Sequence, residues 1–207
     1  MIKRINSAVR RIPAWPLYPL GMLPGVIFLY WGLTNQLGAD PVRALQHLTG
    51  EWALRLLIVV LAITPLLKTT RINLLKFRRA LGLLVFYYAV LHLLNYIVLD
   101  FQFFWPEILQ DLTKRPYVII GMLSFLLMVP LAITSNNASV RRLGAAAWRK
   151  LHRLVYVAAL GGGLHFLLVV KAWPPEPIIH LAIICALLSY RYVEHLRTRT
   201  RMRRSRA

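Results

Sequence analysis

The sequence contains one cysteine and only seven carboxylates, against 26 lysines and arginines, in 207 residues. A single cysteine excludes an internal disulfide framework, and no CxxCH motif for covalent haem attachment is present. The sequence also has no internal repeat, no separate soluble domain and no glycine-rich phosphate loop in a strand–turn–helix setting. These absences direct attention to the long segments from which charge is missing.

Six apolar runs lack any charged side chain, and the shorter ones can be extended to the roughly 20 residues that a membrane-spanning helix needs. The second run reaches this length if it begins at Trp52, with the Arg55 guanidinium reaching the interface. Helices of a water-soluble protein would carry a polar face, and these do not. The sequence therefore predicts an all-α integral membrane bundle of six transmembrane helices, over about 17–33, 52–67, 80–99, 117–134, 151–170 and 178–194.

The cations are unevenly divided between the two predicted sides of this bundle. The termini and the loops at 68–79 and 135–153 hold 21 of the 26 lysines and arginines, and the other side holds Arg43, Arg55, Lys114, Arg115 and Lys171. By the positive-inside rule, both termini are cytoplasmic. The net charge of +19 then faces anionic membrane lipids, and we predict no nucleic-acid partner.

This topology divides the chain into three parts. Residues 1–16 form a basic cytoplasmic segment, which we expect to be retained because no small-residue cleavage site follows it. Residues 17–194 form the transmembrane domain. Residues 195–207 form a basic cytoplasmic tail, which we interpret as a partly disordered segment that contacts lipid.

Three histidines stand out because they lie within or at the edge of these apolar runs. His92 lies in the middle of the third run, and His152 and His165 flank most of the fifth. An ionisable group deep in a hydrophobic segment is costly and usually marks a functional site. Imidazole is a common axial ligand of haem iron. We therefore hypothesise a haem between the helices, of b type because no covalent attachment site exists.

Depth in the membrane indicates which histidines can share one iron. His92 follows Arg79 by thirteen residues, and His165 follows His152 by the same number on a helix of the same direction. Thirteen helical residues rise about 20 Å. His92 and His165 are thus predicted at one level, toward the periplasm, where they could bind one iron from opposite faces. The alternative is two unrelated histidines, each satisfied inside the bundle.

His152 lies nearer the cytoplasm and could belong to a second haem or be an ordinary boundary residue. Its counterpart on the preceding outward helix is Arg78 or Arg79, which cannot bind iron but can pair with a haem propionate. On a regular helix His152 and His165 point about 140° apart. We hypothesise that Gly161–Gly163 accommodates a local change in helical phase.

Another histidine, His47, follows Asp40-Pro41, a pair typical of the start of a helix. We expect a short helix at the periplasmic interface there. His47 is either a surface histidine of that interface or a contact to a haem propionate, a quinone head group or a partner protein.

Several segments of the sequence together resemble a known family. The resemblance covers residues 17–193 and is carried by LGADPVRALQHLTGEWAL, LLIVVLAITPL, RRALGLLVFYYAVLHL, TKRPYVIIGMLSFLLMVPLAITS and LGAAAWRKLHRLVYVAALGGGLHF. These segments are similar to the MsrQ (YedZ) family, haem-binding membrane subunits within the ferric-reductase-like transmembrane superfamily. The histidines of the family correspond to His92, His152 and His165.

The resemblance implies a non-catalytic electron-transfer subunit of a bacterial inner (cytoplasmic) membrane, which carries haem b and to which FMN is attributed. Electrons would come from the quinone pool or a cytoplasmic flavin reductase, and pass to MsrP, a periplasmic molybdenum enzyme that reduces methionine sulfoxide in proteins. The chain lacks the second histidine that NADPH oxidases have on the third helix, and it has no flavin or nicotinamide domain. A stand-alone transmembrane ferric or quinone reductase is the alternative. A transporter is disfavoured because intramembrane acids are missing.

Overall fold

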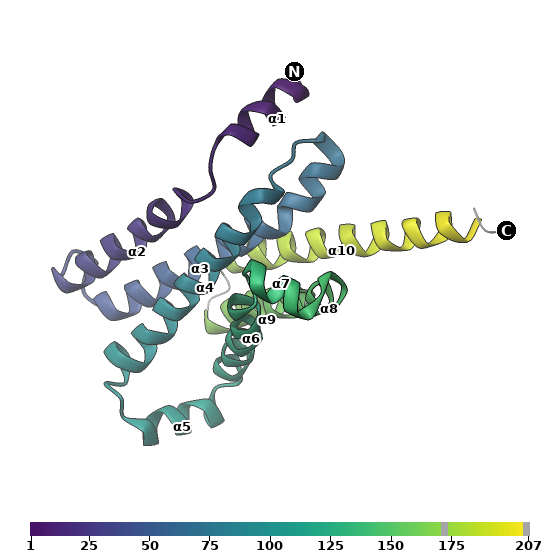
Figure 1. Ribbon diagram of the computed structural model, residues 1–207. Helices are drawn as coiled ribbons and strands as arrows, with labels where there is room; N and C mark the ends of the chain where they lie inside the picture. The colour runs from purple at the N-terminus through teal and green to yellow at the C-terminus, as the bar shows by residue number, and fades with distance from the viewer. Residues whose placement is uncertain (171–173, 205–207) are drawn as a thin grey trace.

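The computed structural model describes residues 1–170 and 174–204, and these residues form helices joined by short loops, with no strand among them (Figure 1). The helices are α1 (Ile2–Arg11), α2 (Leu17–Leu33), α3 (Pro41–Thr70), α4 (Arg78–Leu94), α5 (Trp105–Lys114), α6 (Pro116–Ile133), α7 (Asn137–Leu143), α8 (Ala145–Leu151), α9 (Leu154–Val169) and α10 (Pro175–Arg204). A 3₁₀ turn, η1 (Leu75–Phe77), precedes α4, and a π-helical turn, η2 (Asn95–Asp100), follows it. The predicted all-α class is confirmed.

The described residues include five helical segments that are long and apolar enough to cross a membrane: Pro41–Thr70, Leu75–Asp100, Pro116–Ile133, Ala145–Val169 and Pro175–Thr198. Helix α2 is apolar but shorter, at 17 residues. Large apolar side chains remain exposed around the bundle, among them Leu20, Leu123 and Val157. In water such a surface would be unfavourable, but lipid is a suitable solvent for it. The chain is a multi-pass membrane protein.

Helix α3 includes both the short helix predicted at Asp40-Pro41 and the second predicted span, which are expected to be separate. The helix predicted at Asp40-Pro41 does begin there, with the Asp40 carboxylate accepting a hydrogen bond from the Arg43 amide at 3.0 Å. It then continues without a break through the second predicted span. That span is predicted over about 52–67, with Thr64-Pro65 as its stop signal, and this stop is wrong because Pro65 lies inside the helix, which runs on to Thr70.

A side chain from α10 explains why α3 tolerates Pro65. Proline has no amide hydrogen, so the carbonyl of Leu61, four residues earlier, loses its helical donor. The guanidinium of Arg191 donates to this carbonyl at 2.7 Å. In a membrane, a freed backbone group of this kind is normally satisfied by a neighbouring helix.

A double-mutant cycle tests this contact. Replacing Arg191 by leucine should reduce the free energy of unfolding by about 1–3 kcal/mol, because the Leu61 carbonyl is left buried without a donor. In a Pro65→Ala background the same change should cost less, since alanine restores the amide hydrogen. Chemical denaturation of the four purified proteins measures the coupling. An equal cost in both backgrounds would show that Arg191 does not compensate for the proline.

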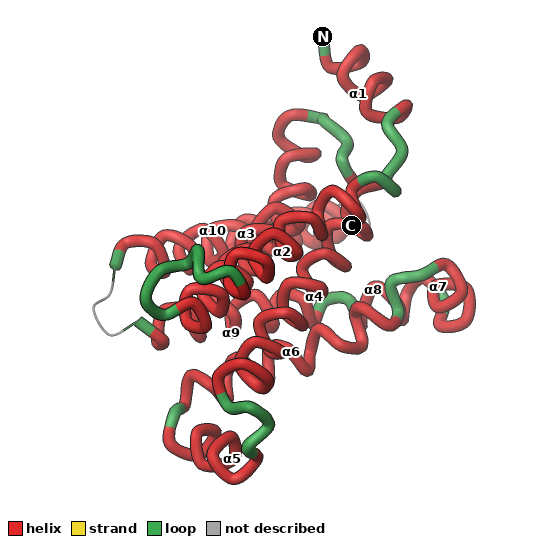
Figure 2. Tube along the Cα trace, turned by 90° about the vertical axis from the view of Figure 1, so that its left-hand side faces the viewer, coloured by secondary structure: helices red, strands yellow, loops and turns green. Residues whose placement is uncertain are grey.

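The bundle is built from helix pairs that meet around α3 (Figure 2). Helix α3 packs on α4, α6 packs on α9, α10 lies against α9 and α3, and α2 covers α3 and α4. One buried cluster joins α3, α4, α9 and α10 and includes Leu57, Val85, Ala159 and Ile184. A second joins α2, α3 and α4 through Phe28, Leu45 and Tyr88. This packing brings the two histidine-bearing helices, α4 and α9, to the same central space.

Helix α1 contacts the loop that follows α3, and α10 contacts the last turns of α3. In α1, Asn6 donates to the Arg71 carbonyl at 3.0 Å and accepts from the Asn73 amide at 3.0 Å. Lys68 pairs with Glu194 of α10 at 2.6 Å. The N-terminal segment, the loop at 68–79 and the end of α10 are therefore at one end of the bundle, as the sequence analysis groups them.

The predicted boundary at residue 194 is not a structural break. Helix α10 continues to Arg204, so the part of the tail that the structure describes is helical rather than disordered. Residues 205–207 and the predicted periplasmic Lys171 lie outside the described residues.

Candidate functional site

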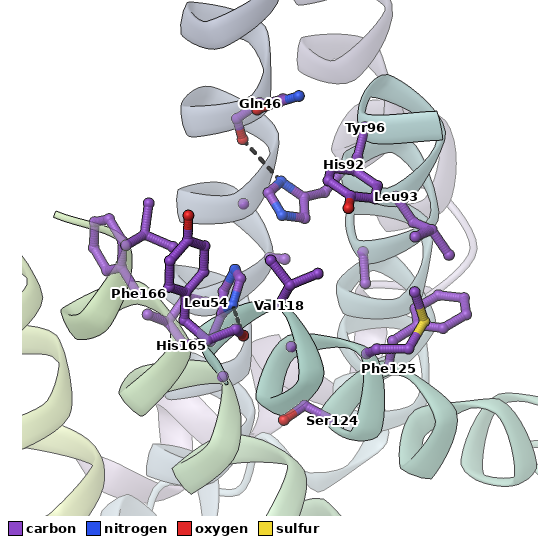
Figure 3. A pocket seen from close by; sticks show the side chains of 18 of the residues that line it. Gln46, Leu54, His92, Leu93, Tyr96, Val118, Ser124, Phe125, His165 and Phe166 are labelled. Atoms are coloured by element: carbon purple, nitrogen blue, oxygen red, sulfur yellow. Dashed lines mark hydrogen bonds between the residues drawn. The ribbon is translucent and has the colours of Figure 1, made fainter. Parts of the chain in front are cut away.

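The central space between α3, α4, α6 and α9 is a cavity of about 580 Å³. Its walls are largely apolar, and its lining includes both His92 of α4 and His165 of α9. Figure 3 shows the two imidazoles pointing into the same space from their separate helices. The volume is within the range of sites that bind small molecules and cofactors.

The two histidines have matching hydrogen bonds. The Nδ1 atom of His92 lies 2.9 Å from the Gln46 carbonyl, and Nδ1 of His165 lies 2.7 Å from the Tyr117 carbonyl. A carbonyl only accepts, so each Nδ1 must carry the hydrogen and donate it. In a neutral imidazole the lone pair is then on Nε2, which is left available to a metal. A backbone carbonyl on the second nitrogen is the usual companion of a metal-binding histidine.

The spacing of the rings fits one metal atom between them. Their centres are 6.0 Å apart, and their planes are inclined by 81°. Imidazole nitrogens bind a first-row metal at about 2 Å, and a ring centre lies about 1 Å behind its bonding nitrogen. Two imidazoles on opposite sides of one metal therefore have centres about 6 Å apart. No cluster of three histidine, cysteine or carboxylate groups exists among the described residues, whereas a haem needs only two axial ligands from the protein.

Two glycines on the facing helices leave space for these rings. A Cβ at Gly121 of α6 would lie 2.7 Å from His165 Nδ1, and a Cβ at Gly50 of α3 would lie 3.1 Å from His92 Nδ1. Each histidine thus lies in a notch that only glycine provides on the facing helix. Sequence reasoning missed both residues, because nothing in the sequence shows which helix faces which ring.

The π-helical turn η2 directly follows the His92 helix and shapes the mouth of the cavity. Within it, buried Asn95 donates to the hydroxyl of buried Thr49 at 3.2 Å, which anchors the turn on α3. The next residue, Tyr96, donates to Asp111 at 2.9 Å, and Asp111 pairs with Arg115 at 2.9 Å. π-Helical turns within helices are rare and frequently occur at functional sites.

Polar side chains gather at this mouth. Gln46 donates through its side chain to Asp100 at 3.1 Å, while its carbonyl holds His92. Arg43 and His47 also line the cavity, so His47 belongs to this site rather than to a distant surface. Partial burial alone would lower the pKa of Arg115, but Asp111 and Tyr117 outweigh it and the pKa is raised, which keeps this cation charged at the rim.

His152 lies elsewhere. It is in the turn between α8 and α9, stacked on Trp148 with ring centres 3.8 Å apart, and its Nε2 lies 3.1 Å from the Thr134 hydroxyl. It does not line the cavity of His92 and His165. Arg78 is close enough for its charge to act electrostatically on His152, whereas Arg79 is exposed.

The hypothesis of a phase change at Gly161–Gly163 is wrong, because α9 is a regular helix from Leu154 to Val169. The glycines instead permit close packing. A Cβ at Gly161 would lie 2.2 Å from the Ser124 hydroxyl of α6. Small residues at such contacts allow transmembrane helices to approach closely. The regular helix leaves His152 and His165 facing different surroundings.

Comparison with known proteins decides the family. Residues 49–163 match the family described as "Ferric reductase like transmembrane component". Three proteins called protein-methionine-sulfoxide reductase heme-binding subunit MsrQ, from Brucella ovis, Brucella canis and Brucella suis, are each 52% identical over 186 residues, which cover 89% of this chain and 84% of the relative. The chain belongs to the MsrQ family. The resemblance inferred from the sequence is thereby confirmed.

In this MsrQ-family chain, residues 49–163 match the ferric-reductase-like family. This region contains α4 with His92, and it ends two residues before His165. It also contains Gly50, Gly121 and His152. The cavity is thus built mainly from the part of the chain that the wider superfamily shares. The mouth residues Asp40, Arg43 and His47 lie before that part.

Proposed function

We propose that the chain binds one haem b between His92 and His165 and acts as a non-catalytic electron-transfer subunit. The observation that carries this proposal is the pair of imidazoles, with ring centres 6.0 Å apart, in a largely apolar cavity. The names of the Brucella relatives support it, because those proteins are called haem-binding subunits.

Each part of the site has a role in this function. The Gln46 and Tyr117 carbonyls fix the tautomer of the two histidines and keep Nε2 directed at the iron. The apolar walls exclude water. When bound, the haem supplies one-electron chemistry, and its potential depends on its axial ligands and on burial.

We further propose that the bundle has six spans, with α2 as the sixth, and that both termini are in the cytoplasm. The distribution of cations supports this orientation. The mouth of the cavity, with Arg43, His47 and Asp111, then faces the periplasm. This arrangement puts the haem close to a periplasmic electron acceptor.

Fusion reporters test the orientation. A fluorescent protein attached after Ala207 should fold and fluoresce, because it remains in the cytoplasm, while alkaline phosphatase at the same position should be inactive. Alkaline phosphatase inserted after Glu107 of α5 should be active. The opposite pattern at both positions would place the haem site on the cytoplasmic side and contradict the assignment of the acceptor.

The proposed acceptor is an MsrP-type periplasmic molybdenum reductase of methionine sulfoxide in proteins, and the proposed donor is the quinone pool or a cytoplasmic flavin reductase, with FMN as a further cofactor. Methionine oxidation is reversible, so a membrane electron source for its repair is coherent chemistry. The names of the relatives support the link to methionine sulfoxide reduction. The alternative is a stand-alone ferric or quinone reductase.

Reoxidation kinetics separate these two functions. Chemically reduced protein should be reoxidised rapidly by MsrP in the presence of a methionine-sulfoxide protein, and slowly by ferric chelates. Absorbance of the haem followed by stopped flow measures both rates, and MsrP without methionine sulfoxide is the control for turnover. Rapid reoxidation by the chelates and not by MsrP would favour the alternative.

A second haem at His152, with Arg78 or Arg79 at a propionate, stays a prediction. Support comes from the proximity of Arg78 to His152. The contact between His152 Nε2 and Thr134 is a competing use of the nitrogen that iron would need.

A further inference from the structure

A second polar cluster lies at the opposite end of the bundle from the cavity mouth, where α3, α4, α9 and α10 meet. Arg191 is at its centre. Its guanidinium donates to the Leu61 carbonyl at 2.7 Å and to the Tyr156 hydroxyl at 3.0 Å, and its central carbon lies 5.4 Å from the Tyr156 ring centre. The Nε–H of Arg191 is buried and has no hydrogen-bond partner among the described residues.

A second cation lies beside it. Arg78 lies near Tyr156 and is close enough to Arg191 for the two guanidinium charges to repel. The carboxylate of this region, Glu194, pairs with Lys68 at 2.6 Å and lies 4.0 Å from Arg197. Two guanidiniums taken out of water together are costly unless an anion compensates them.

We propose that Arg78 and Arg191 bind a phosphate group at this junction. The guanidinium fork matches the oxygens of phosphate, and an unused Nε–H beside a second guanidinium offers converging donors. The group could be carried by an anionic phospholipid, whose head group reaches basic pockets between helices on the cytoplasmic side, or by a soluble phosphate. None of these residues lines the histidine cavity, so the proposal does not depend on haem binding between His92 and His165.

Arg191 also supports the Leu61 carbonyl, so its loss has a structural effect of its own. Arg78 makes no such contact to the backbone that the structure records, which makes Arg78→Gln the sharper test. Arg197→Gln is the matched control, because Arg197 is a cation at the same end of the bundle with a side chain that is 75% exposed. Arg191→Lys keeps the charge and one donor for Leu61 but lacks the fork.

The experiment measures the thermal midpoint of purified, delipidated protein while short-chain phosphatidylglycerol, diacylglycerol of the same chain length, or inorganic phosphate is added. A molecule that binds only the folded protein raises the midpoint. Wild type and Arg197→Gln should respond alike to phosphatidylglycerol or inorganic phosphate. Arg78→Gln and Arg191→Lys should need about tenfold more of the same probe, as expected for the loss of one charge-assisted contact.

The two probes distinguish the sources, since a response to inorganic phosphate identifies a soluble group and a response to phosphatidylglycerol alone identifies a lipid. Three results would overturn the proposal. One is no response of the wild type to either phosphate probe, and another is an equal response to diacylglycerol. The third is a fall in haem per polypeptide in Arg78→Gln, which would assign the cluster to haem carboxylates.

Discussion

Replacing His165 by alanine is expected to abolish the six-coordinate haem spectrum and to lower haem per polypeptide at least about tenfold. One of the two protein ligands is lost, and the imidazole of His92 remains as the single axial histidine in the cavity. His92→Ala should have the same effect. Because both ligands act on one iron, the double variant should lose little more than either single variant.

Pyridine haemochrome assays and absorption spectra of the purified variants measure this effect. His195→Ala is the control, because His195 is exposed on α10. His152→Ala should retain the six-coordinate spectrum and remove at most a second haem. If His152→Ala alone eliminates all haem while His165→Ala keeps it, the pairing of His92 with His165 is wrong.

The second large effect is expected from a single methyl group. Gly121→Ala should weaken haem binding by about 10- to 100-fold, the range seen when groups that orient metal ligands are changed. The new Cβ would lie 2.7 Å from His165 Nδ1 and 2.9 Å from Cε1, so the ring must turn away from its hydrogen bond to Tyr117. Gly50→Ala should have a smaller effect, because its Cβ would lie 3.1 Å from His92 Nδ1.

Gly82→Ala is the matched control for this change. Gly82 is also within a transmembrane helix, but a Cβ there meets nothing within 4 Å. Alanine at a helical glycine should leave haem binding unchanged and add up to about 0.5–1 kcal/mol of stability. Haem titration of the apoproteins, with the thermal midpoint as the measure of folding, separates the two variants. Equal haem affinity for Gly121→Ala and Gly82→Ala would mean that the notch around His165 has no role.

The common level of His92 and His165 could be predicted because helix rise is fixed by the backbone. Counting thirteen residues from two boundary positions on parallel helices was sufficient. The rotation of each ring about its helix could not be predicted in the same way, because it depends on which helices pack together. Gly50, Gly121 and the two carbonyls that hold the imidazoles come from α3 and α6, and only their contacts with α4 and α9 reveal them.

Proline shows the limit of local rules most clearly. Pro65 is a reasonable stop signal in water, and the second span is predicted to end close to it, at about residue 67. In the bundle, the carbonyl it frees is satisfied by Arg191, which is 130 residues away in the sequence. Helix α10 likewise continues beyond the predicted boundary at residue 194, to Arg204. Apolar runs therefore indicate where spans occur, while their ends depend on partners that are distant in the sequence.

The most direct test is to locate iron in an experimental structure of the purified, haem-loaded protein. Anomalous scattering at the iron absorption edge should give a peak between the Nε2 atoms of His92 and His165, within the cavity that Gln46 and Tyr96 also line. A peak beside His152 and none between the other two imidazoles would contradict the assignment of the haem site.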